Sequence, residues 1–282
     1  MSTTFIPAHN LPIAVQARFS GRSRSSFYYT HKMQKRDEGA YAELLPHHES
    51  NPYYGNKRLA LAANMNHKKV SRLMKKFNMH AKTYRKKHGK NQYSKQKTSL
   101  PNLMREVVLT EPNQAWSGDF THIMYQGKTY YLATVIDAYT REIVGWHMEG
   151  SHTVDLVLEA LKMAVRKREK TPKIFHSDHG SEYISEAHVA ELAKHSVLAS
   201  YSEKGKPWQN GIQESTYDKF KGELGDVNRF GFYELFFEAI AMHIRYFNVI
   251  RIHTKLKMSP VNFYKSRMEE INRHQKSTKV AA

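Results

Sequence analysis

Apolar and polar positions alternate between residues 114 and 148, and such alternation is typical of half-buried β-strands. Turn-forming residues interrupt it at Gln126-Gly127 and again between residues 137 and 141. The pattern therefore predicts three antiparallel strands joined by short turns, over residues 115–124, 129–136 and 143–148.

Helical and strand-like segments alternate beyond this point. A polar stretch at 151–153 opens a helix over 153–170, which Thr171-Pro172 ends. The segments that follow are a strand at 173–175, a helix at 185–194, a strand at 197–201 and a helix at 211–224. This order, βββαβαβα, predicts an α/β core of the ribonuclease H-like kind, in which helices cover a mixed five-stranded sheet.

Residues 51–80 have a helical pattern instead. A short helix over 57–63 is followed by a break at Asn64-Met65 and by a second helix over 67–77, which Asn66 can cap. One face of the second helix is basic, with Lys68, Lys69, Arg72, Lys75 and Lys76. This arrangement predicts an α-helical helix-turn-helix whose second helix enters a major groove of DNA. A basic hairpin that contacts only phosphates is the alternative.

The patterns divide the chain of 282 residues into five parts. We predict an N-terminal helical segment over 1–50, a helix-turn-helix domain over 51–80 and a basic linker over 81–110. A catalytic core follows over 111–270, with 246–270 as its C-terminal segment, and residues 271–282 form a tail.

Charge indicates a polyanionic partner. The formal net charge is +18, and residues 51–100 contain fourteen Lys and Arg but no acid. Phosphate backbones explain such an excess better than small acidic substrates do, so we expect DNA binding. Cysteine is absent, which excludes disulfides and a thiolate nucleophile. No apolar run approaches the length of a membrane span and no signal peptide opens the chain, so a cytoplasmic location is expected.

Three acids have surroundings that suggest chemistry. Asp119 lies in AWSGDFTHI, on the predicted polar face of its strand, and Asp178 in FHSDHGSEY directly follows a strand. Glu214 lies on the polar face of a predicted helix, whose inward stripe would be Ile212, Thr216, Phe220 and Leu224. Three such carboxylates can hold two Mg²⁺ or Mn²⁺ ions, which suits phosphodiester chemistry.

Other groups near these acids have more than one interpretation. His176 and His179 flank Asp178 and either bind metal or orient the carboxylate. Asp137 and Glu182 are each interpreted as a turn former or a hydrogen-bond partner rather than as a member of the acidic group. Side chains near the acids are expected to contact DNA: Lys204, Lys206, Trp208, Asn210 and Lys221. Arg251 and His253 follow a predicted helix over 232–248, and they either contact DNA or fix the C-terminal segment.

Four segments, in order, carry a family resemblance. NPYYGNKRLALAANMNHKKVSRLMKKFNM is similar to the helix-turn-helix that precedes the core of OrfB-type insertion-sequence proteins, members of the DDE transposase and retroviral integrase superfamily. HSDHGSEY resembles their HSD-x-GSQY segment, and KGKPWQNGIQES their Gly-x-Pro-x-Asn segment that ends in Glu-Ser. RYFNVIRIHTKLKMSPVNF resembles their Tyr-Asn-x-x-Arg-x-His segment. Two departures are Gly118, where the family usually has Thr, and a shorter stretch between the two N-terminal helices.

The resemblance implies a DNA transposase that cleaves insertion-sequence ends and transfers them to target DNA. Asp119 would bridge two Mg²⁺ or Mn²⁺ ions, while Asp178 and Glu214 would each complete one site. It also implies a homo-oligomer on terminal inverted repeats and an upstream-frame OrfA-type protein as partner or fusion. The alternatives are a ribonuclease H-like nuclease or resolvase, and a non-catalytic DNA-binding regulator.

Overall fold

The computed structural model describes residues 11–27, 32–84, 100–105, 107–203 and 206–280. Five strands form one sheet in the order β3-β2-β1-β4-β5. β1 (Ala115–Tyr125), β2 (Lys128–Asp137) and β3 (Ile143–Glu149) are antiparallel, whereas β4 (Ile174–Ser177) and β5 (Leu198–Tyr201) continue the sheet in parallel from β1. Each strand begins and ends within two residues of its predicted bounds, and the mixed five-stranded sheet is confirmed.

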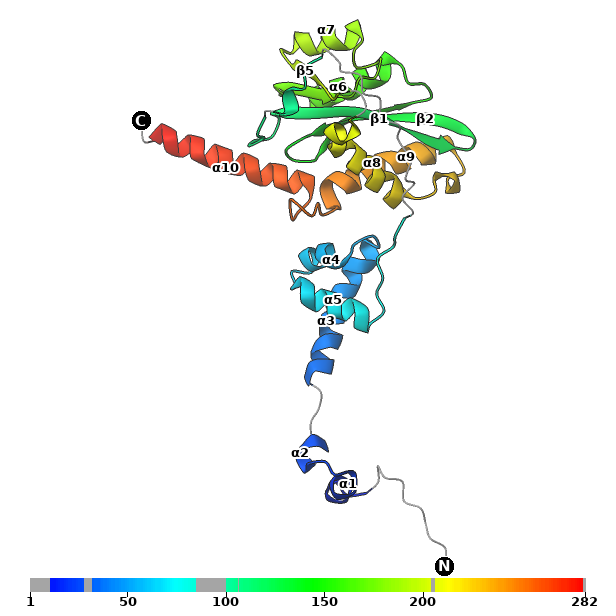
Figure 1. Cartoon of the computed structure of the whole chain (residues 1–282), viewed down its shortest axis with the longest axis vertical. Helices are drawn as coiled ribbons and strands as arrows, with labels where there is room; N and C mark the ends of the chain where they lie inside the picture. Colours follow the sequence, from blue (N-terminus) through cyan, green and yellow to red (C-terminus); the bar gives the residue numbers. More distant parts are fainter. Residues whose placement is uncertain (1–10, 28–31, 85–99, 106, 204–205, 281–282) are drawn as a thin grey trace, which may run out of the picture.

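Helices cover both faces of this sheet (Figure 1). α6 (Val154–Arg168) and α7 (Glu186–Lys194) lie on one face, where Trp116 and Leu156 belong to one buried cluster. α8 (Gly211–Leu224) and α9 (Tyr233–Arg245) lie on the other, where Phe220 and Phe236 pack against β1, β2 and β3. No helix in the described part of the chain is both long and apolar enough to span a membrane.

Three helices ahead of the core enclose an apolar centre of their own. α3 (Lys32–Ser50), α4 (Asn56–Ala62) and α5 (His67–Lys76) bury a cluster that includes Leu44, Leu59 and Leu73. Asn66 caps α5 as predicted, since its side chain accepts a hydrogen bond from the Lys68 amide. Because Leu44 of α3 lies in this cluster, the predicted boundary at residue 50 falls inside one packed unit, the three-helix unit.

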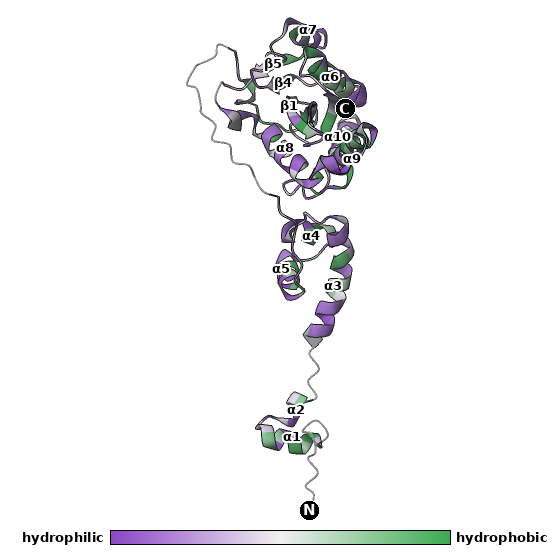
Figure 2. Ribbon diagram, turned by 90° about the vertical axis from the view of Figure 1, so that its right-hand side faces the viewer, coloured by the Kyte–Doolittle hydropathy of each residue, from purple (hydrophilic) through white to green (hydrophobic). Residues whose placement is uncertain are grey.

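Hydrophilic residues dominate α5 and the start of α3 (Figure 2). Two shorter helices, α1 (Ile13–Ser20) and α2 (Arg24–Phe27), precede this unit. Short 3₁₀ turns occur at Leu103–Arg105, Pro207–Asn210 and Val227–Arg229.

The three-helix unit is joined to the core by side-chain contacts. The Tyr54 hydroxyl accepts a hydrogen bond from the Ile252 amide at 2.7 Å. The Tyr246 hydroxyl donates to Asn51 Oδ1 at 3.1 Å, and Arg58 Nη1 lies 3.4 Å from Glu223 Oε1. These contacts dock α4 and the segment before it against α8 and the chain that follows α9.

The C-terminal part differs from its predicted division. A π-helical turn at Tyr246–Ile250 continues α9, so the helix predicted over 232–248 corresponds to α9 and most of this turn. α10 (Pro260–Val280) then crosses the predicted boundary at residue 270, and Figure 1 shows it extending away from the core. Residues 271–280, predicted as a tail, are therefore helical.

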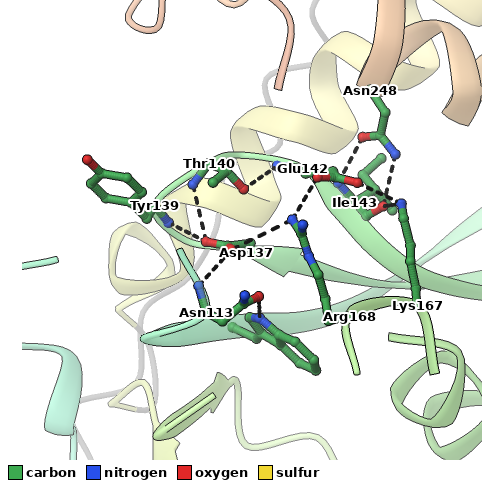
Figure 3. Close-up of polar contacts among 10 residues, drawn as sticks. Asn113, Asp137, Tyr139, Thr140, Glu142, Ile143, Lys167, Arg168 and Asn248 are labelled. Carbon is green, nitrogen blue, oxygen red and sulfur yellow. Dashed lines mark hydrogen bonds and ion pairs between the residues drawn. The ribbon is translucent and has the colours of Figure 1, made fainter. Parts of the chain in front are cut away.

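A buried ionic network fixes the turn between β2 and β3 (Figure 3). Asp137 is fully buried and accepts hydrogen bonds from the backbone amides of Asn113, Tyr139 and Thr140. Arg168 Nη2 at the end of α6 lies 2.6 Å from Glu142 Oε2 and 3.9 Å from Asp137 Oδ2. These contacts confirm the interpretation of Asp137 as a turn former.

Candidate active site

The parallel pairing of β1 with β4 aligns two of the three acids. Ala115 is paired with Ile174, and Ser117 is paired with His176. Continuing this register by two residues places Asp119 opposite Asp178, which directly follows β4. Because neighbouring strands are about 4.8 Å apart, the two carboxylates emerge beside each other at one edge of the sheet.

α8 brings the third acid to the same place. Gln213 Nε2 donates to the carbonyl oxygens of Ser117 at 2.5 Å and Thr134 at 3.2 Å. The Tyr217 hydroxyl donates to the carbonyl oxygen of Asp119 at 2.6 Å. Glu214 lies between these two anchors in the sequence, so α8 is fixed across β1 with Glu214 near Asp119.

This arrangement corrects two sequence predictions about faces. Of the predicted stripe, α8 buries Phe220 and Leu224, whereas Gln213 and Tyr217 are buried in place of Ile212 and Thr216. Asp119 is half-buried, and its side of β1 is covered by α8 and α9 instead of facing solvent. Gln213 and Tyr217 were missed as positioning residues because polar side chains at inward positions look like part of a solvated face.

Electrostatics couple the three acids. Burial, then the charge of Asp178 and more weakly that of Glu214, raise the pKa of Asp119 to about 8, although the Phe120 amide that donates to its Oδ1 opposes the rise. Lys221 also favours the charged form of Asp119. Burial lowers the pKa of the Lys221 ammonium itself. The acids therefore form one coupled group that is short of positive charge.

A hollow of about 850 Å³ opens beside this group. Asp119 and Glu214 line it together with Asp218 and Lys221, so the polar face predicted for this helix points into it. Tyr84, at the end of the three-helix unit, lines it as well, and its ring lies 2.4 Å from where a Cβ on Gly222 would be. Only glycine at position 222 lets the ring lie flat against α8.

Gly118, the departure from the family pattern, has a local explanation. A Cβ at this position would lie 2.4 Å from Phe175 Cζ on β4 and 3.2 Å from Tyr183 Cε1. Real side chains do not approach so closely, so a bulky ring on the neighbouring strand takes the space that a threonine side chain would need. The departure therefore changes the packing behind Asp119 without displacing the acid.

The histidines beside Asp178 have different surroundings. His176 is buried, its Nδ1 lies 2.9 Å from Ser200 Oγ, and burial lowers its pKa to about 4. His179 is half-buried with its ring tilted against Tyr201. Glu182 Oε1 lies 2.6 Å from His152 Nδ1, which confirms Glu182 as a hydrogen-bond partner. Asp178 Oδ1 accepts from the Gly180 amide at 2.9 Å.

The residues expected to bind DNA fall into groups. On α5, Lys68, Lys69 and Lys75 are exposed. Arg72 and Lys76 are ion-paired with the buried Asp37 of α3, at 2.5 and 2.9 Å, yet remain 46% and 41% exposed. These two side chains therefore hold α3 to α5 and still reach the surface.

The remaining expected contacts are mostly packed or paired. Asn210 is buried and accepts from Ser117 Oγ at 3.0 Å, and Lys206 is ion-paired with Glu203. Arg251 is 3% exposed and binds Glu223 at 2.6 Å. This pairing agrees with the alternative that Arg251 fixes the C-terminal segment. Lys204 lies outside the described residues, as does the Trp208 side chain. His253 and Lys221 line hollows.

Fold and site together define the class of an integrase catalytic core. Residues 110–207 match the family model described as the integrase core domain, a range that includes Asp119 and Asp178 and ends before Glu214. The catalytic core of the HTLV-2 integrase, solved in complex with magnesium, is 19% identical with a TM-score of 0.46, and the match covers 55% of this chain and 97% of that structure.

Curated relatives make the family more specific. The chain is 34% identical over 229 residues to the transposase for insertion sequence element IS904 of Lactococcus lactis, which covers 77% of this chain and 90% of that protein. It is 30% identical over 200 residues to a transposase-like protein of Haemophilus influenzae, with 71% and 93% covered. The chain belongs to the insertion-sequence transposases of the DDE transposase and integrase superfamily, and it is a DNA transposase.

Proposed function

We propose that this transposase cleaves insertion-sequence ends and joins them to target DNA at Asp119, Asp178 and Glu214. The observation that supports this most is the register of β1 and β4, which aligns Asp119 with Asp178, together with the anchoring of α8 across Asp119. Asp119 and Glu214 line an open hollow, and the charge of Asp178 raises the pKa of Asp119, an arrangement that suits a metal-dependent DNA-processing site.

The acids fit a pair of divalent ions, Mg²⁺ or Mn²⁺, by their chemistry. In the described residues no three acidic or histidine side chains converge closely enough to hold a metal ion as they stand. However, the neighbouring carboxylates raise the pKa of Asp119, and the exposed Glu214 can rotate toward it. When bound, the ions supply activation of an attacking hydroxyl and stabilisation of the leaving oxygen.

The chain's own residues position these acids and the DNA. Gln213 and Tyr217 hold α8 to the backbone of β1, so the distance between the backbones at Glu214 and Asp119 is fixed before substrate binds. Lys221, beside Asp119 in the same hollow, is placed to bind a phosphate next to the one that reacts.

Recognition of element ends is assigned to the three-helix unit. The exposed Lys68, Lys69 and Lys75, with the outer atoms of Arg72 and Lys76, form one basic surface on α5. A helix with such a surface suits either a major groove or phosphates alone. Contacts from the loop before α8, at Lys204, Lys206 and Trp208, belong to the same proposal, whereas Asn210 and Arg251 are assigned to packing.

Partners beyond DNA follow from the reaction. Joining two ends requires at least two active sites, so we propose a homo-oligomer that forms on terminal inverted repeats. An upstream-frame OrfA-type protein, as partner or fusion, is proposed from the resemblance alone, and weak end binding by the isolated chain would support it. The bacterial relatives and the DNA substrate favour action in the bacterial cytoplasm.

A strand-transfer assay tests the catalytic assignment. Purified protein is mixed with labelled element ends that carry a free 3′-hydroxyl, target DNA and Mg²⁺ or Mn²⁺, beside Asp178→Asn. Asp155→Asn, an exposed acid in the first turn of α6 on the other face of the sheet, is the matched control. We expect joined products with wild type and with the control and none with Asp178→Asn. Nicking without joining would instead indicate a nuclease, and shifted but uncut DNA a binding regulator.

A further inference from the structure

A second hollow, of about 440 Å³, lies on another flank of α8. Its walls come from α4 of the three-helix unit, from α8, from the turn after β2 and from the segment after the π-helical turn. Its cationic lining residues are Arg58, Arg141, Lys219, Arg251 and Lys255. We call it the α8 basic pocket.

Positive charge is in excess here. None of the lining residues is acidic. Glu223 lies behind the lining and is ion-paired with Arg58 and Arg251. Burial lowers the pKa of Arg141, and the negative charge of Asp137 partly opposes this lowering. Lys219 donates a hydrogen bond to Ser215 Oγ, and Lys255 is exposed. The lining itself therefore carries five cations and no acid.

The pKa of His253 is affected by the positive charges that surround it in the pocket. Burial, and then the charges of Arg141, Lys219, Arg251 and Lys255, lower its pKa to about 4. Its Nδ1 is buried without a hydrogen-bond partner among the described residues. A neutral imidazole that has an unused nitrogen and is surrounded by cations suits an anionic oxygen as its neighbour.

The lining favours a phosphate over a whole nucleotide. Phe247 is the aromatic ring in the lining apart from His253, and it is buried beneath the guanidinium of Arg251, 4.5 Å from its centroid. No phenyl or indole face of the described lining is left for a base to stack on. Binding would therefore be independent of base identity.

We propose that the α8 basic pocket holds one backbone phosphate of the DNA strand whose reacting phosphodiester lies at the three acids. This inference rests on the proposed function, since it takes the acids as the reaction centre. Glu214 and Ser215 are adjacent on α8 but line the two different hollows. A helix with side chains is about 10–12 Å across. Phosphates of one strand recur about every 3.4 Å along the duplex axis, so the held phosphate lies about three nucleotides from the reacting one.

The location of the pocket gives this contact a purpose. Arg58 belongs to the unit assigned to end recognition, whereas Lys219 belongs to the helix that carries Glu214. One phosphate bound between them ties the position of the recognised end to the position of the acids. A contact of this kind would set the distance between the recognised sequence and the cleaved bond.

Binding of full-length protein to a labelled element end, in EDTA so that no reaction occurs, tests the site. Lys219→Gln/Lys255→Gln removes two charges from the lining, and Lys257→Gln removes one exposed charge from the same loop outside the lining. We expect the double variant to bind roughly tenfold more weakly and its salt dependence to fall by about one phosphate contact. The control should behave as wild type.

Uncharged methylphosphonate linkages, placed one at a time along the end, locate the phosphate. At one linkage position, or at two neighbouring ones, the substitution should weaken DNA binding by wild type but not by the double variant, because the double variant already lacks that phosphate contact. Equal weakening of both proteins at every position would overturn the proposal, as would tight binding of free dATP that the double variant loses. Failure of metal-dependent joining by wild type would sink the proposed reaction and leave this binding result standing.

Discussion

Asp119 shows how one residue serves chemistry at a cost to the fold. It is half-buried against α8, and burial, then the charges of Asp178 and Glu214, raise its pKa to about 8. Like charges this close oppose ionisation unless a cation is present. Removing one of the charges should therefore relieve the metal-free protein while it destroys the proposed reaction centre.

Asp119→Asn should stabilise the metal-free protein at pH 7. The amide keeps the shape of the carboxyl and is neutral without taking up a proton, a step that Asp119 needs at pH 7 because its pKa is raised to about 8, so we expect a free energy of unfolding higher by about 1–3 kcal/mol and no strand transfer. Added Mg²⁺ should raise the free energy of unfolding of wild type and leave that of the variant unchanged. Urea unfolding with and without Mg²⁺ measures both effects, and a less stable metal-free variant would contradict the argument.

Gly118→Ala tests the explanation of the family departure. The added methyl group would meet the Phe175 ring, so we expect a loss of about 1–3 kcal/mol in unfolding free energy. Phe175→Leu makes space at the same point, and the double variant should lose less than the sum of the two single losses. Gly150→Ala, where a Cβ would meet nothing within 4 Å, serves as the control in the same chemical unfolding measurement.

At the residue scale, sequence patterns could indicate the three acids but not what holds them. Motif surroundings and strand ends pointed to Asp119, Asp178 and Glu214, and the structure brings them together. The anchors Gln213 and Tyr217 could not be predicted, because a polar residue that bonds to a backbone oxygen looks like any solvated residue. Arg251 was ambiguous for the same reason until its pairing with Glu223 was visible.

At the scale of elements, the periodicity of apolar residues predicted helix bounds well where a helix has one apolar and one polar face. The bounds of α8 match its predicted range, and Asn66 caps α5 as predicted. Charge hid two features of the helices. Residues 271–280 look like a polar tail but continue α10, and α3 joins the three-helix unit largely through Leu44 and a buried carboxylate, that of Asp37. A single carboxylate of this kind has a consequence for stability.

Asp37 should make the three-helix unit sensitive to acid. Hydrogen bonds from Arg72 and then Lys76 hold the pKa of Asp37 well below its usual range. A carboxyl whose pKa is lowered on folding stabilises the protein above its ordinary pKa of about 4, and that contribution is lost as the pH falls below this value. Amides of α3 and α5 should therefore lose hydrogen-exchange protection progressively from about pH 5 downward, and most of the loss should occur below about pH 3.

Two variants separate this effect from general acid unfolding. Asp37→Asn should reduce the protection of α3 and α5 already at pH 7 and remove most of its dependence on pH. Glu43→Gln, an exposed acid on α3, should leave the wild-type profile unchanged. If Asp37→Asn kept the wild-type dependence on pH, the ion pairs of α3 with α5 would not be its source.

At the scale of the whole molecule, one buried carboxylate links the three-helix unit to the core. Glu223 of α8 binds Arg251 at 2.6 and 2.7 Å and also reaches Arg58 of α4. No local pattern predicts this, because the partners are separated by 28 and 165 residues. The arrangement of the two units therefore depends on charges that sequence periodicity assigns to solvent.

Glu223→Gln should weaken both the core and its attachment to the three-helix unit. Arg251 would stay buried at 3% exposure without its counter-ion, and leaving such a charge unpaired costs about 3–5 kcal/mol. Arg58 would lose its partner at the same time, so proteolysis between α3 and α4 should become faster, together with a lower urea midpoint. Glu238→Gln, on the exposed side of α9, is the matched control and should change neither quantity. An unchanged midpoint with faster proteolysis would limit the role of Glu223 to docking, since the buried Arg251 would then have found another partner.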